Sequence, residues 1–121
     1  MTSAKAAGDR GEALVARYLL EAGYTLLDRQ WRCRFGELDL VARSREGIVC
    51  FVEVKLRRTQ RFGTGAEQVD QRKREKLRIT AELYLQERPA VLQPRFDVVE
   101  VLAPNGLGTK NPKIRHIEGA F

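Results

Sequence analysis

The sequence has 121 residues, of which 43% are hydrophobic and 31% charged, with a formal net charge of +6. This composition is typical of one globular domain over residues 1–121, and no apolar run reaches the roughly 20 residues of a membrane span or resembles a secretory signal, so we expect a cytoplasmic protein. Two cysteines without CxxC spacing and one histidine exclude a disulfide scaffold and a zinc cluster within the chain.

The first predicted element is a helix over residues 9–22. Asp9 is the expected N-cap, which places Glu12 at the third helical position of a capping box, and Gly23 is the expected end. Apolar side chains recur there at helical spacing and form one stripe that we expect to face the core: Leu14, Val15, Tyr18, Leu19 and Ala22.

Three strands are predicted next, over residues 24–33, 35–44 and 47–57. The third has a continuous apolar run around Cys50, which predicts a central strand buried on both faces. We expect both cysteines, Cys33 and Cys50, to be reduced and mostly buried. A nucleophilic Cys–His pair is the alternative, although nothing in the sequence places either cysteine near His116.

A basic loop over residues 57–65 separates these strands from a long predicted helix over residues 66–87. Two further strands, over residues 95–104 and 112–121, are joined by a segment rich in turn residues. The order of helix, three strands, helix and two strands predicts an α/β fold with a mixed central β-sheet flanked by helices. The long helix should face the core with Val69, Leu77, Thr80 and Tyr84.

The connection between the second and third strands predicts how these strands pair. Residues 45–47 fit a three-residue hairpin loop with Gly47 in the left-handed conformation. This closure pairs Ser44 with Ile48. A loop of two or four residues would shift the pairing by one and place the acidic side chains on opposite faces.

The predicted register brings acidic side chains together inside the hairpin. It sets Asp39 opposite Glu53, and it sets Glu37 opposite Lys55, where Glu37 either pairs with the lysine or assists in binding a metal. Two carboxylates that face each other in a partly buried sheet require a shared proton or a cation, and a hard divalent ion with oxygen ligands is such a cation. The alternative is an edge strand with a solvated charged face, and a Glu-x-Lys triplet alone carries little information in so charged a chain.

The segments GELDLV and FVEVKLR resemble the core of PD-(D/E)xK nucleases. Around them, GDRGEALVARYLLEAGY, RFDVVEV and HIEGAF are similar to the YraN family of bacterial proteins, which is grouped with restriction-endonuclease-like and Holliday-junction-resolvase-like folds. The resemblance implies a restriction-endonuclease-like fold. It implies that Asp39 and Glu53 hold a metal, that Lys55 is the catalytic lysine and that Glu12 is the helix-borne glutamate. Leu38 stands where the motif has proline.

Basic side chains around the hairpin suit a polyanionic partner, because phosphates release counterions when lysine and arginine replace them. We expect nucleic-acid backbone contacts from two groups of arginines, with solvated surface as the alternative: Arg57, Arg58 and Arg61 in the loop, and Arg29, Arg32 and Arg34 before the acidic strand. Lys73, on the apolar side of the long helix, is either a snorkelling stem or a phosphate ligand. Trp31 and Phe62 are either stacking platforms or core residues, and His116 and Asp97 are interpreted as structural.

These observations support three functional hypotheses. The first is a Mg²⁺- or Mn²⁺-dependent endonuclease acting on DNA rather than RNA, including branched or junction DNA, with Asp39, Glu53 and the carbonyl of Val54 as metal ligands. The second is a non-catalytic nucleic-acid-binding module that retains the nuclease fold. The third is a small adaptor acting through a protein partner. By analogy with resolvase-like proteins, a homodimer is one expected oligomeric state.

Overall fold

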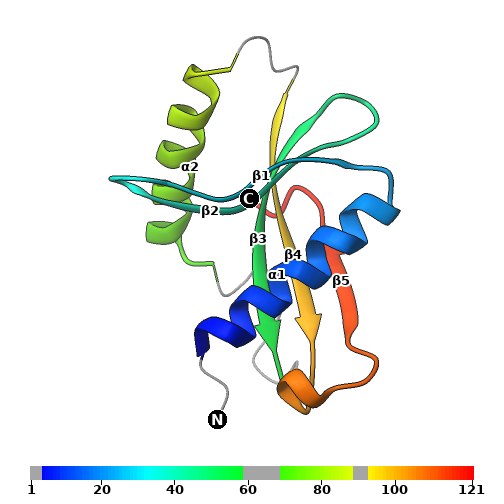
Figure 1. The fold of residues 1–121 in the computed structure, drawn as a ribbon. Helices are drawn as coiled ribbons and strands as arrows, with labels where there is room; N and C mark the ends of the chain where they lie inside the picture. The colour runs from blue at the N-terminus through cyan, green and yellow to red at the C-terminus, as the bar shows by residue number, and fades with distance from the viewer. Residues whose placement is uncertain (1–3, 59–68, 89–92) are drawn as a thin grey trace.

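The structure is a computed structural model and describes residues 4–58, 69–88 and 93–121. Its elements follow the predicted order of helix, three strands, helix and two strands, with a short 3-10 helix before the last strand (Figure 1). Their bounds are α1 Ala4–Glu21, β1 Thr25–Cys33, β2 Gly36–Arg43, β3 Val49–Arg57, α2 Gln71–Gln86, β4 Pro94–Leu102, η1 Gly106–Gly108 and β5 Lys113–Ile117.

The five strands form one mixed sheet in the order β1-β2-β3-β4-β5. Strands β3 and β4 are parallel and the other neighbouring pairs are antiparallel. Parallel neighbours require a crossover connection, and α2 lies in the segment that supplies it. The α/β fold with a mixed, helix-flanked sheet is therefore confirmed, and it matches the restriction-endonuclease-like architecture that the resemblance implies.

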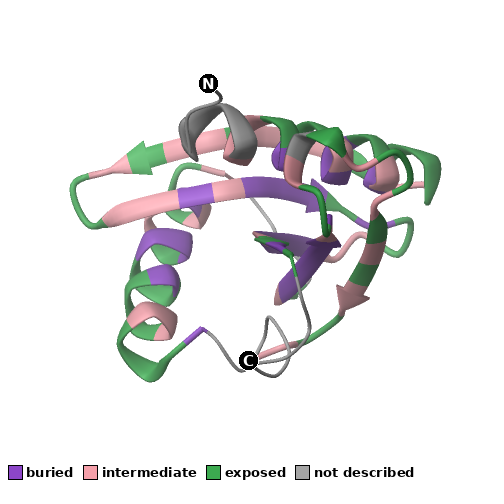
Figure 2. Ribbon diagram, turned by 90° about the horizontal axis from the view of Figure 1, so that it is seen from below, coloured by how far each residue is buried: buried purple, intermediate pink, exposed green. Residues whose placement is uncertain are grey.

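The two helices cover opposite faces of the sheet, and each face has its own apolar core. Figure 2 shows the buried positions concentrated on the central strands and on the inner sides of the helices. Strand β3 contributes to both cores by alternation, with Cys50 and Val52 toward α1 and Val49 and Phe51 toward α2. The prediction that this strand is central and buried on both faces is confirmed.

Both helices start at positions that differ from the predicted ones. Helix α1 begins at Ala4, so Asp9 lies inside it, and the proposed N-cap role of Asp9 is wrong. The apolar stripe on which the prediction of residues 9–22 rested does pack in the core, through Val15 and Leu19 among others. Helix α2 begins at Gln71, because the side chain of Asp70 caps it by accepting a hydrogen bond from Lys73 N at 2.9 Å.

The closure of the β2–β3 hairpin agrees with the prediction. Gly47 has a φ of 88°, the Ser44 amide donates to the Ile48 carbonyl at 2.8 Å, and the Ile48 amide donates to Ser44 Oγ at 3.1 Å. The loop therefore fixes the register, since glycine adopts the left-handed conformation without steric cost. Neither helix, over the residues described, is long and apolar enough to cross a membrane.

Candidate metal and phosphodiester site

The paired part of β2 and β3 ends, on the side away from the hairpin loop, at Leu40 and Val52. The first residue beyond this pair is acidic on both strands. Asp39 follows on β2 and Glu53 on β3. The Val54 amide donates to Asp39 Oδ2 at 2.9 Å, so the Asp39 carboxylate accepts this hydrogen bond in place of a backbone carbonyl of β2. This bond holds the Asp39 carboxylate against β3, on the side of the sheet that α2 covers and where Glu53 is buried, 7% exposed.

Two lysine side chains approach the Glu53 carboxylate from different elements. Lys73 Nζ, from the first turn of α2, lies 2.5 Å from Glu53 Oε1, and Lys55 Nζ, on the same strand, lies 3.9 Å from the same oxygen. The Asp70 cap sets where α2 begins and thereby directs Lys73 toward the sheet. The structure thus brings together four of the residues singled out in the sequence: Asp39, Glu53, Lys55 and Lys73.

Burial and mutual repulsion dominate the electrostatics of these groups. Burial, followed by the charge of Glu53, raises the pKa of Asp39 to about 7, against the opposing hydrogen bond from Val54. Burial and then the charge of Lys73 lower the pKa of Lys55. Burial is also the largest single effect on Lys73 and opposes its charge, but the hydrogen bond and the charge of Glu53, together with Lys55 and Asp39, outweigh burial and raise the pKa of Lys73. Burial therefore opposes the charged forms of Asp39, Lys55 and Lys73 alike.

Glu12 approaches the same region from α1 and leaves a buried oxygen unsatisfied. Among the described residues, none provides a hydrogen-bond partner for Glu12 Oε1, and burial raises the pKa of this carboxyl group against a lowering contribution from Gln30. Its charge also contributes to raising the pKa of Asp39. Gln30 has a φ of 50°, the only positive value among the described non-glycine residues, and donates to Asp9 Oδ1 at 3.0 Å. Strained backbone of this kind accumulates at functional sites.

The donor set fits a hard divalent ion that keeps part of its water shell. The described residues contain no group of three Asp, Glu, His or Cys side chains close enough to hold a metal by themselves. Mg²⁺, however, is commonly held by one or two carboxylates together with waters and substrate phosphates. Asp39 and Glu53 supply the carboxylates, and Val54 presents its carbonyl on the Asp39 side, because the N–H and C=O of one strand residue point to the same side.

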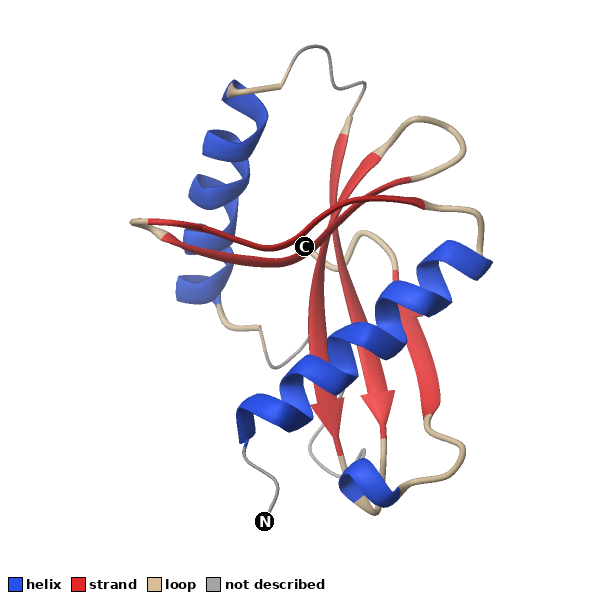
Figure 3. Cartoon of the chain, in the orientation of Figure 1, coloured by secondary structure: helices blue, strands red, loops and turns tan. Residues whose placement is uncertain are grey.

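An open hollow of about 280 Å³ leads to the two carboxylates. The β1–β2 hairpin bends away from the other strands toward α2 and forms one wall, and α2 forms the other (Figure 3). Beneath Asp39 and Glu53 the floor is apolar, with Phe51 and Leu77 among its members, which explains the cost of ionising Asp39. The hollow is lined by Phe35, Gly36, Glu37, Asp39, Glu53, Lys73, Lys76, Leu77 and Thr80.

The predicted pairing of Glu37 with Lys55 is wrong. Because β2 leaves β3 beyond Leu40, Glu37 pairs only with β1 among the described strands, and there Arg32 Nε lies 3.4 Å from Glu37 Oε2.

Trp31 packs edge-to-face on Tyr84, with ring centroids 5.3 Å apart, so its core interpretation holds. Sequence reasoning missed Phe35, whose exposed ring lines the hollow.

The arginines expected to contact nucleic acid occupy different environments. Arg57 is buried and ion-paired with Glu100 at 3.5 Å. Arg58 is exposed and lies near Gly106. Arg61, like the aromatic Phe62, falls outside the described residues.

Cys50 is buried and Cys33 only partly so, and both are free thiols.

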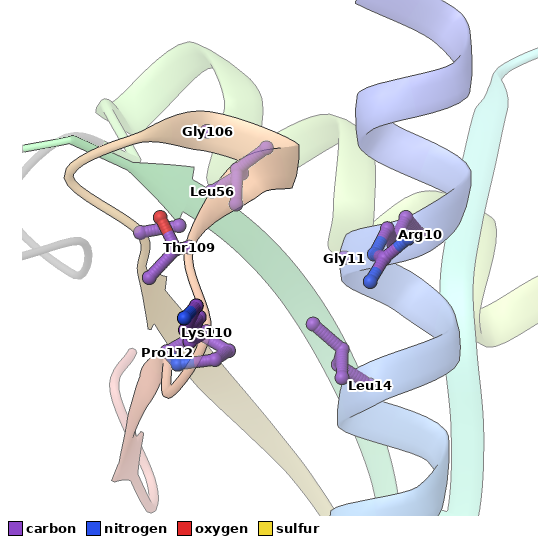
Figure 4. Close-up of a pocket in the computed structure, with 9 residues that line it drawn as sticks. Arg10, Gly11, Leu14, Leu56, Gly106, Thr109, Lys110 and Pro112 are labelled. Atoms are coloured by element: carbon purple, nitrogen blue, oxygen red, sulfur yellow. The ribbon is translucent and has the colours of Figure 1, made fainter.

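Two further features lie apart from the carboxylates. Asp97 is fully buried and binds His116 Nε2 at 2.7 Å and Arg95 at 2.8 Å, while His116 Nδ1 contacts the hydroxyl of Tyr18 at 2.9 Å. This network ties α1 to β4 and β5, so the structural interpretation of Asp97 and His116 holds. Figure 4 shows a hollow of about 90 Å³ between α1 and the β4–β5 connection, lined by Arg10 and Lys110 among others and by none of the site residues.

Comparison with known proteins places the chain in a family. Residues 11–101 match the family described as Uncharacterised protein family UPF0102. A UPF0102 protein of Nocardia farcinica is 47% identical over 97% of this chain and 90% of its own length, and one of Rhodococcus opacus is 44% identical over 96% of each chain. A third, of Syntrophomonas wolfei, is 46% identical over 92% of this chain and 93% of its own. The chain therefore belongs to the UPF0102 family.

Proposed function

We propose that this protein is a Mg²⁺- or Mn²⁺-dependent nuclease that hydrolyses phosphodiester bonds of DNA. The observation that carries the proposal is the convergence of Asp39 and Glu53 at the end of the β2–β3 ladder, beside Lys55. Acids facing a phosphate backbone would weaken simple binding, because like charges repel. A pair of carboxylates in a hollow that also carries Lys73 and Lys76 is therefore better suited to hold a cation against a phosphate.

Each residue of the site has a defined role in this proposal. Asp39 and Glu53 bind the metal with the Val54 carbonyl, and the unsatisfied oxygen of Glu12 is available to a water of the metal shell. The chemistry that a bound Mg²⁺ or Mn²⁺ supplies is an acidified water and neutralisation of phosphate charge. Lys55 orients the attacking water or stabilises negative charge on the phosphate. When the substrate binds, Lys73 releases its ion pair with Glu53 and pairs with the incoming phosphate instead.

A non-catalytic nucleic-acid-binding module is the second candidate, and the short Lys73–Glu53 contact favours it. An ion pair at 2.5 Å already compensates Glu53 without any metal. In that case Asp39 would be satisfied by its proton and by the Val54 amide. The two candidates differ in one property, since only the first makes cleavage depend on divalent metal and on Asp39.

The test is a cleavage assay on labelled single-stranded, duplex and branched DNA with Mg²⁺ or Mn²⁺. We expect metal-dependent cleavage that falls by about 100-fold or more in Asp39→Asn and in Lys55→Ala, the range seen when a group that stabilises the transition state is removed. Glu21→Gln is the matched control, because Glu21 is an exposed carboxylate on α1 that pairs only with Arg17 among the described residues.

The control variant should cleave like the unmodified protein. Equal residual activity in the unmodified protein, Asp39→Asn and Lys55→Ala would identify a contaminant and reject the nuclease. Salt-sensitive DNA binding without metal-dependent cleavage would select the binding module instead.

A further inference from the structure

Phe35 stands at the tip of the β1–β2 hairpin, where an apolar ring is 43% exposed beside a charged site. It lines the same hollow as Asp39 and Glu53. Four other large apolar side chains are exposed in the described part of the chain, and none of them lines the hollow that holds the carboxylates. They are Leu20, Leu27, Leu56 and Ile79. A single exposed apolar side chain is ordinary on a protein surface, so the inference depends on the position of Phe35 in the hollow and on the cations near it.

The tip that carries Phe35 is held in place rather than loosely attached. A Cβ atom added to Gly36 would lie 3.0 Å from Thr80 Oγ1, so the hairpin backbone rests directly on α2. Tyr84, also on α2, packs against Trp31 of β1 and donates to Asp28 Oδ2 at 2.8 Å. The ring is therefore presented at a fixed position relative to Lys73 and Lys76 on the opposite wall.

Cations lie on both sides of the hollow, although one of them, Arg32, also pairs with Glu37. The guanidinium of Arg34 lies over the face of Phe35, 4.7 Å from the ring centroid, and the Arg32 side chain is 66% exposed on the same hairpin. Lys76 is exposed on the helix opposite. Aromatic rings interleaved with cations form the surface on which single-stranded nucleic acids bind, with bases stacked on rings and phosphates paired with cations.

We propose that Phe35 is a specificity residue that stacks on an unpaired nucleobase next to the phosphate that a cation bound at Asp39 and Glu53 would hold. The inference rests on the proposed function for the acidic hollow, and it names the substrate class: nucleic acid with unpaired nucleotides beside the bond to be cut. Inside a duplex both faces of a base are covered by its neighbours, so only an unpaired or displaced base can offer a face to the ring.

A second copy of this chain is the main alternative occupant of the exposed ring. The tip carries Arg32 and Arg34, so an isologous contact would bring like charges together around the ring, which favours a polyanion instead. A wedge inserted between paired bases is the other alternative, and it predicts duplex binding that depends on Phe35.

The experiment measures binding by the full-length protein with Mg²⁺ present and with Lys55→Ala in every variant, so that the proposed metal ligands Asp39 and Glu53 stay intact while cleavage is slowed by about 100-fold or more. Fluorescence anisotropy compares a labelled single strand with the same strand in a blunt duplex, and a 2-aminopurine base reports stacking directly. We expect Phe35→Ala to weaken single-strand binding by about tenfold and to abolish the 2-aminopurine quenching, whereas Phe35→Trp retains both. Duplex binding should change by less than about twofold, because phosphate contacts dominate it. Ile79→Ala, an exposed apolar residue on α2 outside the hollow, should leave both affinities unchanged.

Several outcomes would overturn the inference. These are an equal loss on both substrates, an unchanged single-strand affinity in Phe35→Ala, or no single-strand binding by the unmodified protein at low salt. A Phe35-dependent change of sedimentation without a change in binding would assign the ring to a dimer contact and also overturn it. Metal-dependent cleavage without a Phe35 effect would reject the stacking role alone, and Phe35-dependent binding without cleavage would reject only the nuclease.

Discussion

At the scale of single residues, Asp39 shows what the site costs the folded protein. Its carboxylate lies above an apolar floor and beside Glu53, and burial followed by the charge of Glu53 raises its pKa to about 7 from an ordinary value of 3.8. Asp97 is the opposite case on the same sheet. Burial opposes its ionisation, but hydrogen bonds from His116, Arg95 and Gly119 outweigh burial and lower its pKa. The fold therefore opposes ionisation of Asp39 and favours ionisation of Asp97.

Asp39→Asn should stabilise the metal-free protein at alkaline pH. The unfolded chain releases the Asp39 proton near pH 4 and the folded chain near pH 7, so the free energy of unfolding falls as pH rises between these values. Above about pH 7 ionised Asp39 costs about 2–4 kcal/mol, which the amide does not incur. Urea denaturation in EDTA at about pH 8 and pH 4 measures the difference, which should nearly vanish at the lower pH.

Asp97→Asn is the matched control, and its effect should have the opposite sign. The depressed pKa of Asp97 gives stability that is present above about pH 4 and lost as pH falls through the folded value, so the amide should destabilise the protein by a few kcal/mol at about pH 8. An Asp39→Asn protein that is less stable than the unmodified one at this pH would show that the carboxylate is not a strained group.

The residues of the site differ in how far the sequence could predict them. Asp39, Glu53 and Lys55 follow from strand alternation and one short loop, which are local properties. The ion pair of Lys73 with Glu53 depends on the residue at which α2 begins. The sequence predicts this residue only approximately. Strand alternation places Phe35 on the same face as Glu37 and Asp39, but alternation does not distinguish an exposed ring from a core residue. The other sequence signal of Phe35 was an aromatic residue between arginine and glycine just before the acidic strand.

At the scale of elements, the site exists because β2 changes partners along its length. Its C-terminal half pairs with β3 on one side and β1 on the other, but beyond Leu40 it pairs with β1 alone and crosses over α2. The register predicted from the sequence is correct near the loop and wrong at Glu37. The prediction assumed that β2 and β3 stay paired along their whole length, whereas the pairing ends at Leu40 and Val52. The bend is set by contacts between the hairpin and α2, which are distant in the sequence.

Gly36→Ala tests whether this close contact positions the hairpin. The new Cβ atom would lie 3.0 Å from Thr80 Oγ1, in a buried contact, so we expect a loss of about 1 kcal/mol in the free energy of unfolding. Adding Thr80→Ala removes the opposing atom and should recover part of the loss in a double-mutant cycle. Fully additive effects would mean that the hairpin and α2 are not in contact at this point.

At the scale of the whole molecule, charge is distributed by sign and by depth. The net charge is +6, yet acidic side chains are buried on the α2 side of the sheet, at Glu53 and Glu100, each facing a cation. Lys73 and Lys76 of α2 line the hollow, and Arg32 is exposed on the hairpin that forms its other wall. Composition alone predicts a polyanionic partner, but the acidic centre of a basic surface is a property of the fold.

The central claim, that Asp39 and Glu53 together hold a divalent ion, is tested most directly by isothermal titration calorimetry with Mn²⁺ and Mg²⁺ at about pH 8, where Asp39 is ionised. The account predicts a saturable heat of binding for the unmodified protein and for Glu21→Gln, and its loss in Asp39→Asn. The absence of a binding heat for the unmodified protein, with and without a DNA strand, would contradict it. An unchanged titration of Asp39→Asn would contradict it equally.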